Sequence, residues 1–486
     1  IRRGKTKDWV IKRELKTTPN SIFNRKILEE DIKRLYGTSL FNDIKVSLAA
    51  DDANPGTVII TLDISEQKTG SLTGGIGFSN SSGVFAQAGL SETNTFGRSW
   101  STNFNLNFGE YSTTYDFSLI DPWIKGDKHR TSFKTNVFLS RDFPQEFRSE
   151  SNGRFYGISD FYKASGDNIA SEITGSYSSV DAAKAADPNS SWFDYEGASI
   201  VLENIGGGFS FSRPLNGGDP FKSSPWRVSA GMNLKQVRII DSAGRERAYA
   251  TAASKTSTRN VSDIICIGYQ PKDGSCPSIN KLVSFTTSAT RNKLNNSVNP
   301  TSGNRLRFGS EQFISVGNDS PNFNKLYTSY SWFIPSNLIK LSKGCRSEDA
   351  DANTCPQTLG FQLKAATNIG ELPPYEAFCL GGSSSVRGWG SCELGVSKSF
   401  AEASAEYRFP VWRMISGALF VDAGSDLGTQ NDVPGKPGKL LKKVGSGYSL
   451  GAGVGVKTPV GPLRIDAASQ DLSGKMRYTL GVGWKF

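Results

Sequence analysis

Apolar and polar side chains alternate through one short segment after another between Thr69 and Phe486. Near residue 100, for example, Trp100, Phe104 and Phe108 fall on one side of the alternation, and serine and asparagine fall on the other. Successive side chains of a β-strand point to opposite faces, so this period of two predicts strands with one apolar and one polar face. A soluble β-sandwich can also alternate. The charges on the polar face and the very unequal loops favour membrane strands that are apolar outside and polar inside.

The alternation predicts an all-β transmembrane barrel of about 16 antiparallel strands, an even number as in bacterial barrels. The expected spans are 69–79, 82–93, 97–109, 111–121, 129–142, 197–213, 225–240, 280–292, 303–315, 324–335, 357–369, 397–411, 413–425, 446–457, 460–469 and 475–486. Long connections at 143–196, 241–279 and 370–396 are expected on one side of the membrane. The connection 336–356 is also long but falls on the other side of the membrane. The number of strands could therefore differ from 16 by one hairpin.

The composition is compatible with a membrane barrel, although the mean hydropathy is −0.37. No apolar run approaches the ~18 residues of a spanning helix, but only alternate residues of a barrel strand face lipid. The formal net charge of +10 would suit a nucleic-acid-binding protein, yet the basic residues form no single stripe. Many of them fall inside the alternating strands, which indicates a polar lumen and no nucleic-acid partner. These residues are Lys134, Arg227, Lys235, Arg305, Arg307, Arg408 and Arg464.

Residues 1–66 have a different pattern, which predicts a small α+β domain. A helix with one apolar face is expected at about residues 24–36, and two alternating strands follow at about 41–48 and 58–66. The chain begins at Ile1 in what reads as the end of a strand. We therefore expect the first strand of this domain to precede it.

A glycine-rich stretch at residues 381–390 holds a single cation, Arg387, between Val386 and Trp389. Glycine permits tight turns and a close approach of the main chain. Downstream, Asp422 lies on the opposite face from its apolar neighbours, so it faces the barrel interior if they face lipid. A carboxylate there needs a cation, and Arg387 on an inward-folded loop is our candidate partner. A solvated arginine on a surface hairpin is the simpler alternative.

These two segments resemble the BamA-type outer-membrane assembly-factor superfamily. Its inward-tucked surface loop carries a tip motif that here reads Val386, Arg387, Gly388 and Trp389. The strand motif that receives the arginine reads Phe420, Asp422 and Gly424. The tryptophan replaces the usual tyrosine or phenylalanine and keeps an aromatic side chain.

The resemblance implies a domain organisation. Residues 67–486 would form the barrel, with loop 370–396 folded into its lumen, and residues 1–66 would be part of a membrane-proximal POTRA (polypeptide-transport-associated) domain. The last strand resembles the β-signal of outer-membrane proteins, and its matching residues are Thr479, Gly481, Trp484 and Phe486. Trp484 and Phe486 are expected to share the apolar face of this strand with Tyr478 and Leu480.

Six cysteines fall as three sequence-local pairs in polar, loop-like segments, and no CxxC spacing is present. Locality favours the pairings 266–276, 345–355 and 379–392, which would imply an oxidising compartment. Because His129 is the single histidine, no metal site is expected. The cysteines are Cys266, Cys276, Cys345, Cys355, Cys379 and Cys392.

The resemblance implies an assembly factor that folds and inserts β-barrel proteins through a lateral seam between its first and last strands. A protein-translocating channel of the same superfamily, as in chloroplast envelope import or two-partner secretion, is the alternative. No enzyme activity and no cofactor are expected, since the sequence lacks a phosphate-binding loop and a Gly-x-Ser-x-Gly elbow.

Expected partners are unfolded outer-membrane protein clients and the lipid bilayer, joined by periplasmic chaperones or accessory assembly subunits. The expected location is a bacterial outer membrane of the cyanobacterial type, with the POTRA domain in the periplasm. The chloroplast outer envelope is the alternative location.

Overall fold

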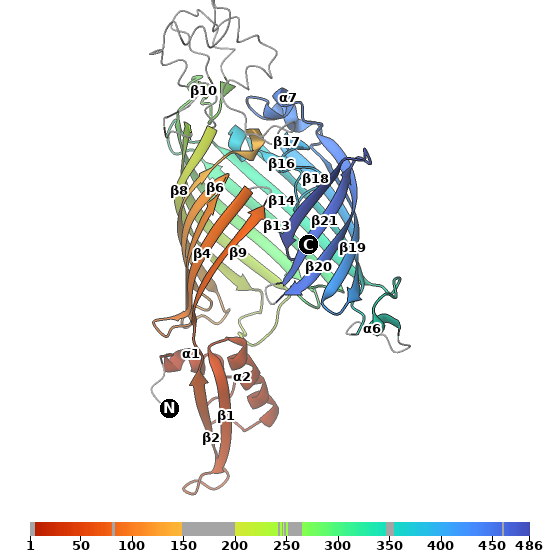
Figure 1. The fold of residues 1–486 in the computed structure, drawn as a ribbon. Helices are drawn as coiled ribbons and strands as arrows, with labels where there is room; N and C mark the ends of the chain where they lie inside the picture. Colours follow the sequence, from red (N-terminus) through yellow and green to blue (C-terminus); the bar gives the residue numbers. More distant parts are fainter. Residues whose placement is uncertain are drawn as a thin grey trace, which may run out of the picture.

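The computed structural model of the 486-residue chain has a large β-barrel next to a small amino-terminal domain (Figure 1). The structure describes residues 5–79, 83–147, 200–241, 244, 246, 249–250, 265–346, 354–458 and 461–486. Most of the expected long loop 143–196 and about half of the loop 241–279 lie outside the described residues.

Sixteen strands form one antiparallel sheet, which confirms the predicted fold class. Their bounds are Gly70–Ser79 (β3), Gly83–Thr95 (β4), Trp100–Gly109 (β5), Ser112–Asp121 (β6), Ser132–Asp142 (β7), Ile200–Pro214 (β8), Trp226–Asp241 (β9), Ile279–Asn292 (β12), Gly303–Ile314 (β13), Phe323–Pro335 (β14), Thr358–Gly370 (β15), Ser399–Trp412 (β18), Ile415–Ser425 (β19), Ser446–Thr458 (β20), Gly461–Gln470 (β21) and Met476–Val482 (β22). β14 pairs directly with β15, so the long connection between them hides no extra hairpin of the barrel.

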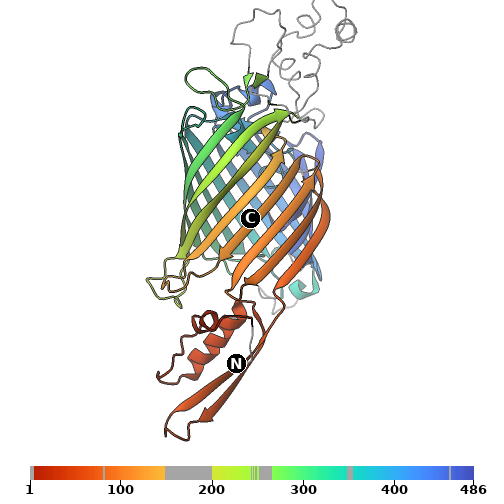
Figure 2. The same cartoon turned by 90° about the vertical axis from the view of Figure 1, so that its left-hand side faces the viewer.

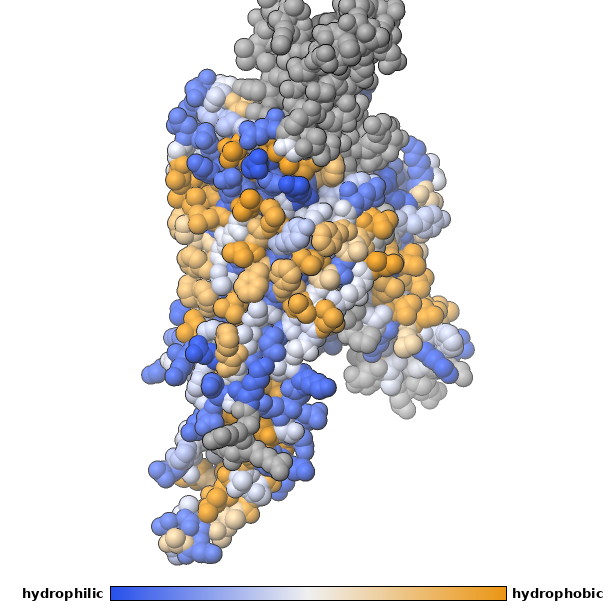
Figure 3. All heavy atoms as spheres, turned by 60° about the vertical axis from the view of Figure 1, so that its left-hand side comes forward, coloured by the Kyte–Doolittle hydropathy of each residue, from blue (hydrophilic) through white to orange (hydrophobic). Residues whose placement is uncertain are grey.

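Side chains along each strand alternate between the outer and the inner surface of the barrel. The outward residues Leu326, Leu363 and Ile465 are 40%, 50% and 56% exposed, as expected for contact with lipid. On the face of the barrel seen in Figure 3, apolar residues gather over the middle of the barrel, with hydrophilic residues towards both of its ends. The inward residues Glu406 and Arg408 are buried. Their burial is tolerated because they pair with other charged groups inside the lumen.

The sheet does not close on itself by strand pairing in the described part of the chain. β3 pairs only with β4 and β22 pairs only with β21, so these two strands are the ends of the sheet. β22 is also shorter than expected, because it ends at Val482 and Gly483 has φ +81°. The expectation that Trp484 and Phe486 continue the apolar face of this strand is wrong, since both rings contact the inward-facing Arg408. Figures 1 and 2 mark the carboxyl end of the chain (C) at the barrel.

An apolar core closes the barrel at the end opposite the amino-terminal domain. Phe313 and Phe323 stack there with ring centroids 4.1 Å apart, and they pack with Leu372 and Tyr375 of the connection after β15. The short elements of the connections are η1 (Gln145–Phe147), β10 (Tyr249–Ala250), β11 (Ile265–Cys266), η4 (Pro374–Glu376), β16 (Phe378–Leu380), β17 (Gly395–Ser397), η5 (Thr429–Asp432) and α7 (Pro437–Leu440).

Three disulfides are present, and each joins two consecutive cysteines of the sequence, 10 to 13 residues apart, as predicted. Cys266–Cys276 and Cys379–Cys392 lie in connections at the capped end, where β10 and β16 are found (Figure 1). Cys345–Cys355 lies in the connection that holds α6 (Lys343–Arg346), at the end of the barrel near the amino-terminal domain (Figure 1).

The amino-terminal domain contains α1 (Asp8–Lys12), α2 (Arg25–Gly37), β1 (Phe41–Ala50) and β2 (Val58–Glu66). The side chain of Asn24 accepts hydrogen bonds from two main-chain amides at the start of α2, a standard helix cap. The two helices and the hairpin share an apolar core of Val10, Leu35, Leu40, Phe41 and Ile44. In the part of the chain that the structure describes, none of the helices has the length and apolar composition needed to cross a bilayer.

Charged and aromatic side chains fix this domain to the turn between β6 and β7. The Arg13 guanidinium lies 4.9 Å from the ring centroid of Trp9 and 5.3 Å from that of Trp123. It also donates a 2.5 Å hydrogen bond to the Trp123 carbonyl. Glu14 is buried and forms a 3.0 Å ion pair with Arg130. Burial raises the pKa of the Glu14 carboxyl, although both arginines oppose the shift.

Arg130→Gln should loosen this junction, since it leaves the buried Glu14 carboxylate without its nearest ion-pair partner at a cost of about 1–3 kcal/mol. Spin labels at the exposed positions Lys33 and Lys457 should then give a broader distance distribution by double electron–electron resonance. Lys128→Gln, in the same turn but exposed, is the control. Equal distributions for both variants would contradict the fixed junction.

Candidate functional site

The connection between β15 and β18 turns back into the lumen at a glycine-rich tip. β16 and β17 pair to form its neck, and the Cys379–Cys392 disulfide joins its two arms. Gly381 and Gly388 have φ values of +106° and +91°, a region that side-chain-bearing residues rarely adopt. The glycines of the motif therefore permit the turn that carries Arg387 inwards.

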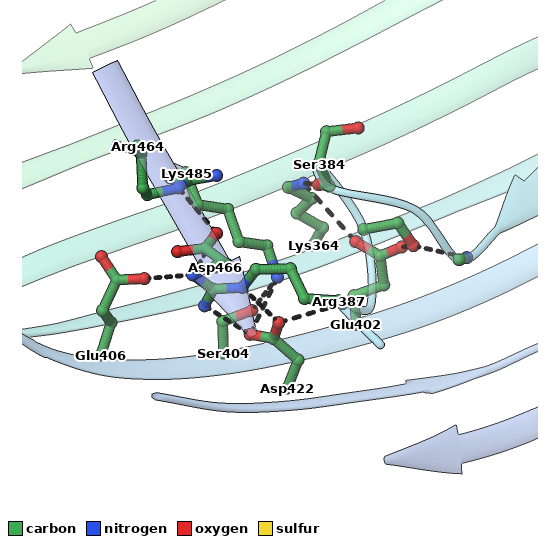
Figure 4. A network of polar contacts seen from close by, with 12 residues as sticks. Lys364, Ser384, Arg387, Glu402, Ser404, Glu406, Asp422, Arg464, Asp466 and Lys485 are labelled. Carbon is green, nitrogen blue, oxygen red and sulfur yellow. Dashed lines mark hydrogen bonds and ion pairs between the residues drawn. The ribbon is translucent and has the colours of Figure 1, made fainter. Parts of the chain in front are cut away.

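Arg387 has no solvent-exposed surface and contacts three carboxylates (Figure 4). Its Nε and NH2 groups donate to the two oxygens of Asp422 over 2.7 and 3.0 Å. Its NH1 group donates to Glu406 over 2.5 Å and lies 3.6 Å from Asp466. The flat guanidinium also lies over the Phe420 ring, 3.4 Å from the centroid. This bidentate and stacked geometry suits arginine and not lysine.

The other residues of the loop tip pack closely against the barrel wall. Val386 and Trp389 are buried with Leu380 and Leu394 in a small apolar cluster. A Cβ added to Gly424 would lie 2.7 Å from a methyl group of Val386, and one added to Gly388 would lie 3.2 Å from Ala468. Gly424 therefore leaves the space into which the loop tip fits.

Residues 483–486 enter the same charge cluster from the last strand. The Lys485 ammonium lies 2.9 Å from Asp422 Oδ1 and donates to Ser404 over 2.6 Å. Arg408 donates to the main-chain oxygen of Phe486 over 2.8 Å and lies 4.9 Å from the Trp484 ring centroid. Asp422 is therefore shared by the loop and by the segment that follows β22.

The sequence-predicted residues are thus divided between two places. The structure brings together the tip residues Val386, Arg387, Gly388 and Trp389 with the strand residues Phe420, Asp422 and Gly424. Of the expected β-signal residues, Thr479 and Gly481 lie in β22 and pair with Asp466 and Arg464. Trp484 and Phe486 lie beyond the end of the strand.

Sequence reasoning missed Glu406, Asp466 and Lys485 as members of the cluster. A signal was present, because all three occupy polar positions of alternating segments. Alternation gives the face of a residue but not its height in the barrel, so it does not identify partners from different strands.

A second ion-pair site holds the beginning of the loop. Glu376 of η4 lies 2.6 Å from the ammonium of Lys235 and 2.5 Å from that of Lys325. Burial alone would raise the pKa of the Glu376 carboxyl, but the two ammonium groups lower it to about 2. The loop is therefore anchored by buried charges at two separate points.

Arg387→Gln should release the loop tip, because buried carboxylates that lose their cation cost about 3–5 kcal/mol. Hydrogen–deuterium exchange of residues 381–392 should increase, and Arg387→Lys should restore protection only in part, since an ammonium cannot pair with both oxygens in the same way. Arg413→Gln, on an exposed turn, should leave the exchange unchanged. Unchanged exchange in Arg387→Gln would show that the cluster does not hold the loop.

The sequence of the chain is similar to those of chloroplast proteins. The chain is 24% identical over 487 residues to outer envelope protein 80 of Arabidopsis thaliana chloroplasts, covering 99% of this chain and 54% of that protein. It is 24% identical over 473 residues to the chloroplast protein TOC75 of Oryza sativa subsp. japonica, covering 93% and 50%. The chain thus spans about half the length of these curated relatives.

The fold is also that of solved structures. BamA from Haemophilus ducreyi lacking POTRA domains 1–3 superposes with a TM-score of 0.62 at 16% identity, covering 98% of this chain and 81% of that one. Residues 3–67 match the POTRA family described as surface antigen variable number repeat. Residues 94–486 match the Omp85 superfamily domain, so the chain is a member of the Omp85 superfamily with a POTRA domain ahead of its barrel.

Proposed function

We propose that this protein is an assembly factor that folds β-barrel proteins and inserts them into an outer membrane through the seam between β3 and β22. The observation that carries the proposal is the absence of strand pairing between these two ends of the sheet in the described part of the chain. A main-chain edge without partners costs several kcal/mol per group in lipid. A strand of an incoming client would satisfy that edge by β-augmentation.

The composition of the seam supports easy opening. β3 contains Gly70, Gly74, Gly75 and Gly77, and glycine is a poor strand former. β22 has only seven residues, and its ladder with β21 ends at Val482. Both sides of the seam therefore offer little side-chain packing to hold them together.

The capped end of the barrel supports insertion over conduction. The apolar core around Phe313, Phe323 and Tyr375 lies across that end, and the Arg387 loop occupies part of the lumen. A polypeptide crossing through the lumen would have to displace both. A client leaving sideways through the seam would displace neither, and burial of its apolar strands in lipid would drive the reaction without a nucleotide.

The disulfides support a location in a bacterial outer membrane. Cys345–Cys355 lies on the side of the POTRA domain, and the other two disulfides lie at the opposite end. Disulfides at both ends call for oxidising conditions on both sides of the membrane, as at the periplasm and the cell surface. In this arrangement the POTRA domain lies in the periplasm and receives unfolded clients, together with any chaperones or accessory subunits.

Closing the seam should stop client insertion. Cysteines replacing Thr73 of β3 and Thr479 of β22 would be joined by a short bifunctional thiol reagent in purified protein in liposomes. Folding of an added barrel client, read as its heat-modifiable gel mobility, should then be lost.

The matched control joins cysteines at Ser71 and Ser91. Their hydroxyl groups are already 2.8 Å apart across the paired strands β3 and β4, so this crosslink should leave insertion unchanged. Full insertion with the seam crosslinked would rule out lateral opening.

Depletion of the protein in its host separates assembly from translocation. If the protein assembles barrels, a proteomic census of the outer membrane should show a general loss of β-barrel proteins. Loss of a single exported protein, with the other barrels unchanged, would instead identify a dedicated translocating channel.

A further inference from the structure

Four cations on the lumen wall have no acidic partner among the residues that the structure describes. Of the seven basic strand residues that the sequence analysis names, Lys235 pairs with Glu376, Arg408 with Glu406, and Arg464 with Asp466. The remaining four form no ion pair with any residue that the structure describes; they are Lys134, Arg227, Arg305 and Arg307. Among the described residues, the only hydrogen bond from one of their side chains runs from Arg227 to the Ser212 hydroxyl, over 3.4 Å.

The strand register places these cations on the lumen face. Phe313 of β13 belongs to the internal core, and Arg305 and Arg307 lie at even spacings from it on the same strand. Thr290 of β12 is the register partner of both Arg307 and Arg227, and register partners share a face of the sheet. The guanidinium groups therefore point inwards, away from lipid.

The three arginines form a compact group. Arg227 and Arg307 lie two strands apart in one row, which corresponds to about 10 Å, and Arg305 lies about 7 Å further along β13. Their register neighbours are hydroxyl-bearing residues such as Thr290, Ser329 and Ser331. Like charges so close together repel one another, and an anion between them would relieve that repulsion.

Carboxylates of the same wall do not neutralise the group. Asp116 of β6 and Glu311 of β13 also face the lumen, but neither forms an ion pair with any of the four cations. Glu311 instead accepts a 2.7 Å hydrogen bond from Ser284. The tip of the Arg387 loop is bound to the opposite wall, to strands β18, β19 and β21. The beginning of the loop reaches β9, but its carboxylate Glu376 pairs there with Lys235, eight residues along the strand from Arg227.

The group lies at the mouth of the barrel next to the POTRA domain. Arg227 is the second residue of β9 and Arg305 is the third residue of β13. The turn that leads into β9 carries Phe221, and the POTRA residue Arg34 lies over its ring at 4.6 Å. A chain guided along the POTRA domain would meet these arginines on entering the lumen, where lipid has no access.

We propose that Arg227, Arg305 and Arg307 form a lumenal binding site for an acidic, extended polypeptide segment that enters from the POTRA side. Same-face side chains of an extended chain recur about every 7 Å, which matches the spacing of Arg305 and Arg307. Arginine pairs with carboxylates through two parallel hydrogen bonds, and a cleft lined by charges of one sign concentrates ligands of the opposite sign. The proposal goes beyond seam insertion, because such a site would bind peptide whether or not the seam opens.

The test is binding of a fluorescent peptide, with glutamate alternating with serine, to the full purified chain by anisotropy. Arg305→Gln combined with Arg307→Gln should weaken binding about tenfold and reduce its salt dependence. The control combines Arg213→Gln with Arg291→Gln, which makes the same charge change on the outer face of β8 and β12. Heat-modifiable gel mobility verifies folding of both variants.

Each other outcome would overturn the proposal. If both pairs of substitutions weakened peptide binding equally, the loss of affinity would come from the change in net charge and not from this site. If a lysine–serine peptide bound as tightly as the glutamate–serine peptide, the site would not select acidic segments. Displacement of the peptide by inorganic phosphate at an equal concentration of charge would reduce the site to one for simple anions. A wild-type protein that inserts clients but binds no acidic peptide would overturn this proposal and leave the proposed function standing.

Discussion

A buried arginine held by carboxylates from the barrel wall determines how the lumen is filled. Burying one charge would be prohibitive, and Arg387 is tolerated because Asp422 and Glu406 bind its guanidinium directly. The glycine conformations of the loop tip and the space left by Gly424 follow from the same requirement, because the charges must approach to hydrogen-bonding distance. The main effect of the cluster is therefore to fix the position of the loop, and its effect on the free energy of unfolding is secondary.

The same cluster connects the loop to one side of the seam. Lys485 contacts Asp422, the carboxylate that Arg387 binds through two hydrogen bonds, and Arg477 of β22 lies 2.8 Å from Glu393 of the loop. A displacement of β22 would disturb both contacts. Among the described residues, none of the ion pairs that hold the loop involves β3, on the other side of the seam, so the two edges are held very differently.

Much of this could be predicted from the sequence, because alternation reports directly on the face of each strand. The spans of the sixteen strands follow from it, and the three cysteine pairs follow from the closeness of the cysteines in the sequence. The exception is residues 483–486, where the alternation continues through Trp484 and Phe486 but Gly483 adopts a positive φ and the chain leaves the sheet. Glu406 escaped prediction because its contact depends on strand register, which one sequence does not specify. Lys485 escaped prediction because it lies in the segment that leaves the sheet after β22.

The contrast between the two lumen walls has a physical cause. On the wall of β18 to β21 the cations are excluded from water by the loop, so each needs a carboxylate nearby. On the wall of β7 to β13 the side chains of Lys134, Arg227 and Arg307 remain exposed within the lumen, and water there can solvate them at little cost. On the same wall Lys235 of β9, which the loop does reach, pairs with Glu376. Unpaired cations are therefore tolerable at the end of this wall that the loop does not reach, and that end keeps its charge available for a ligand.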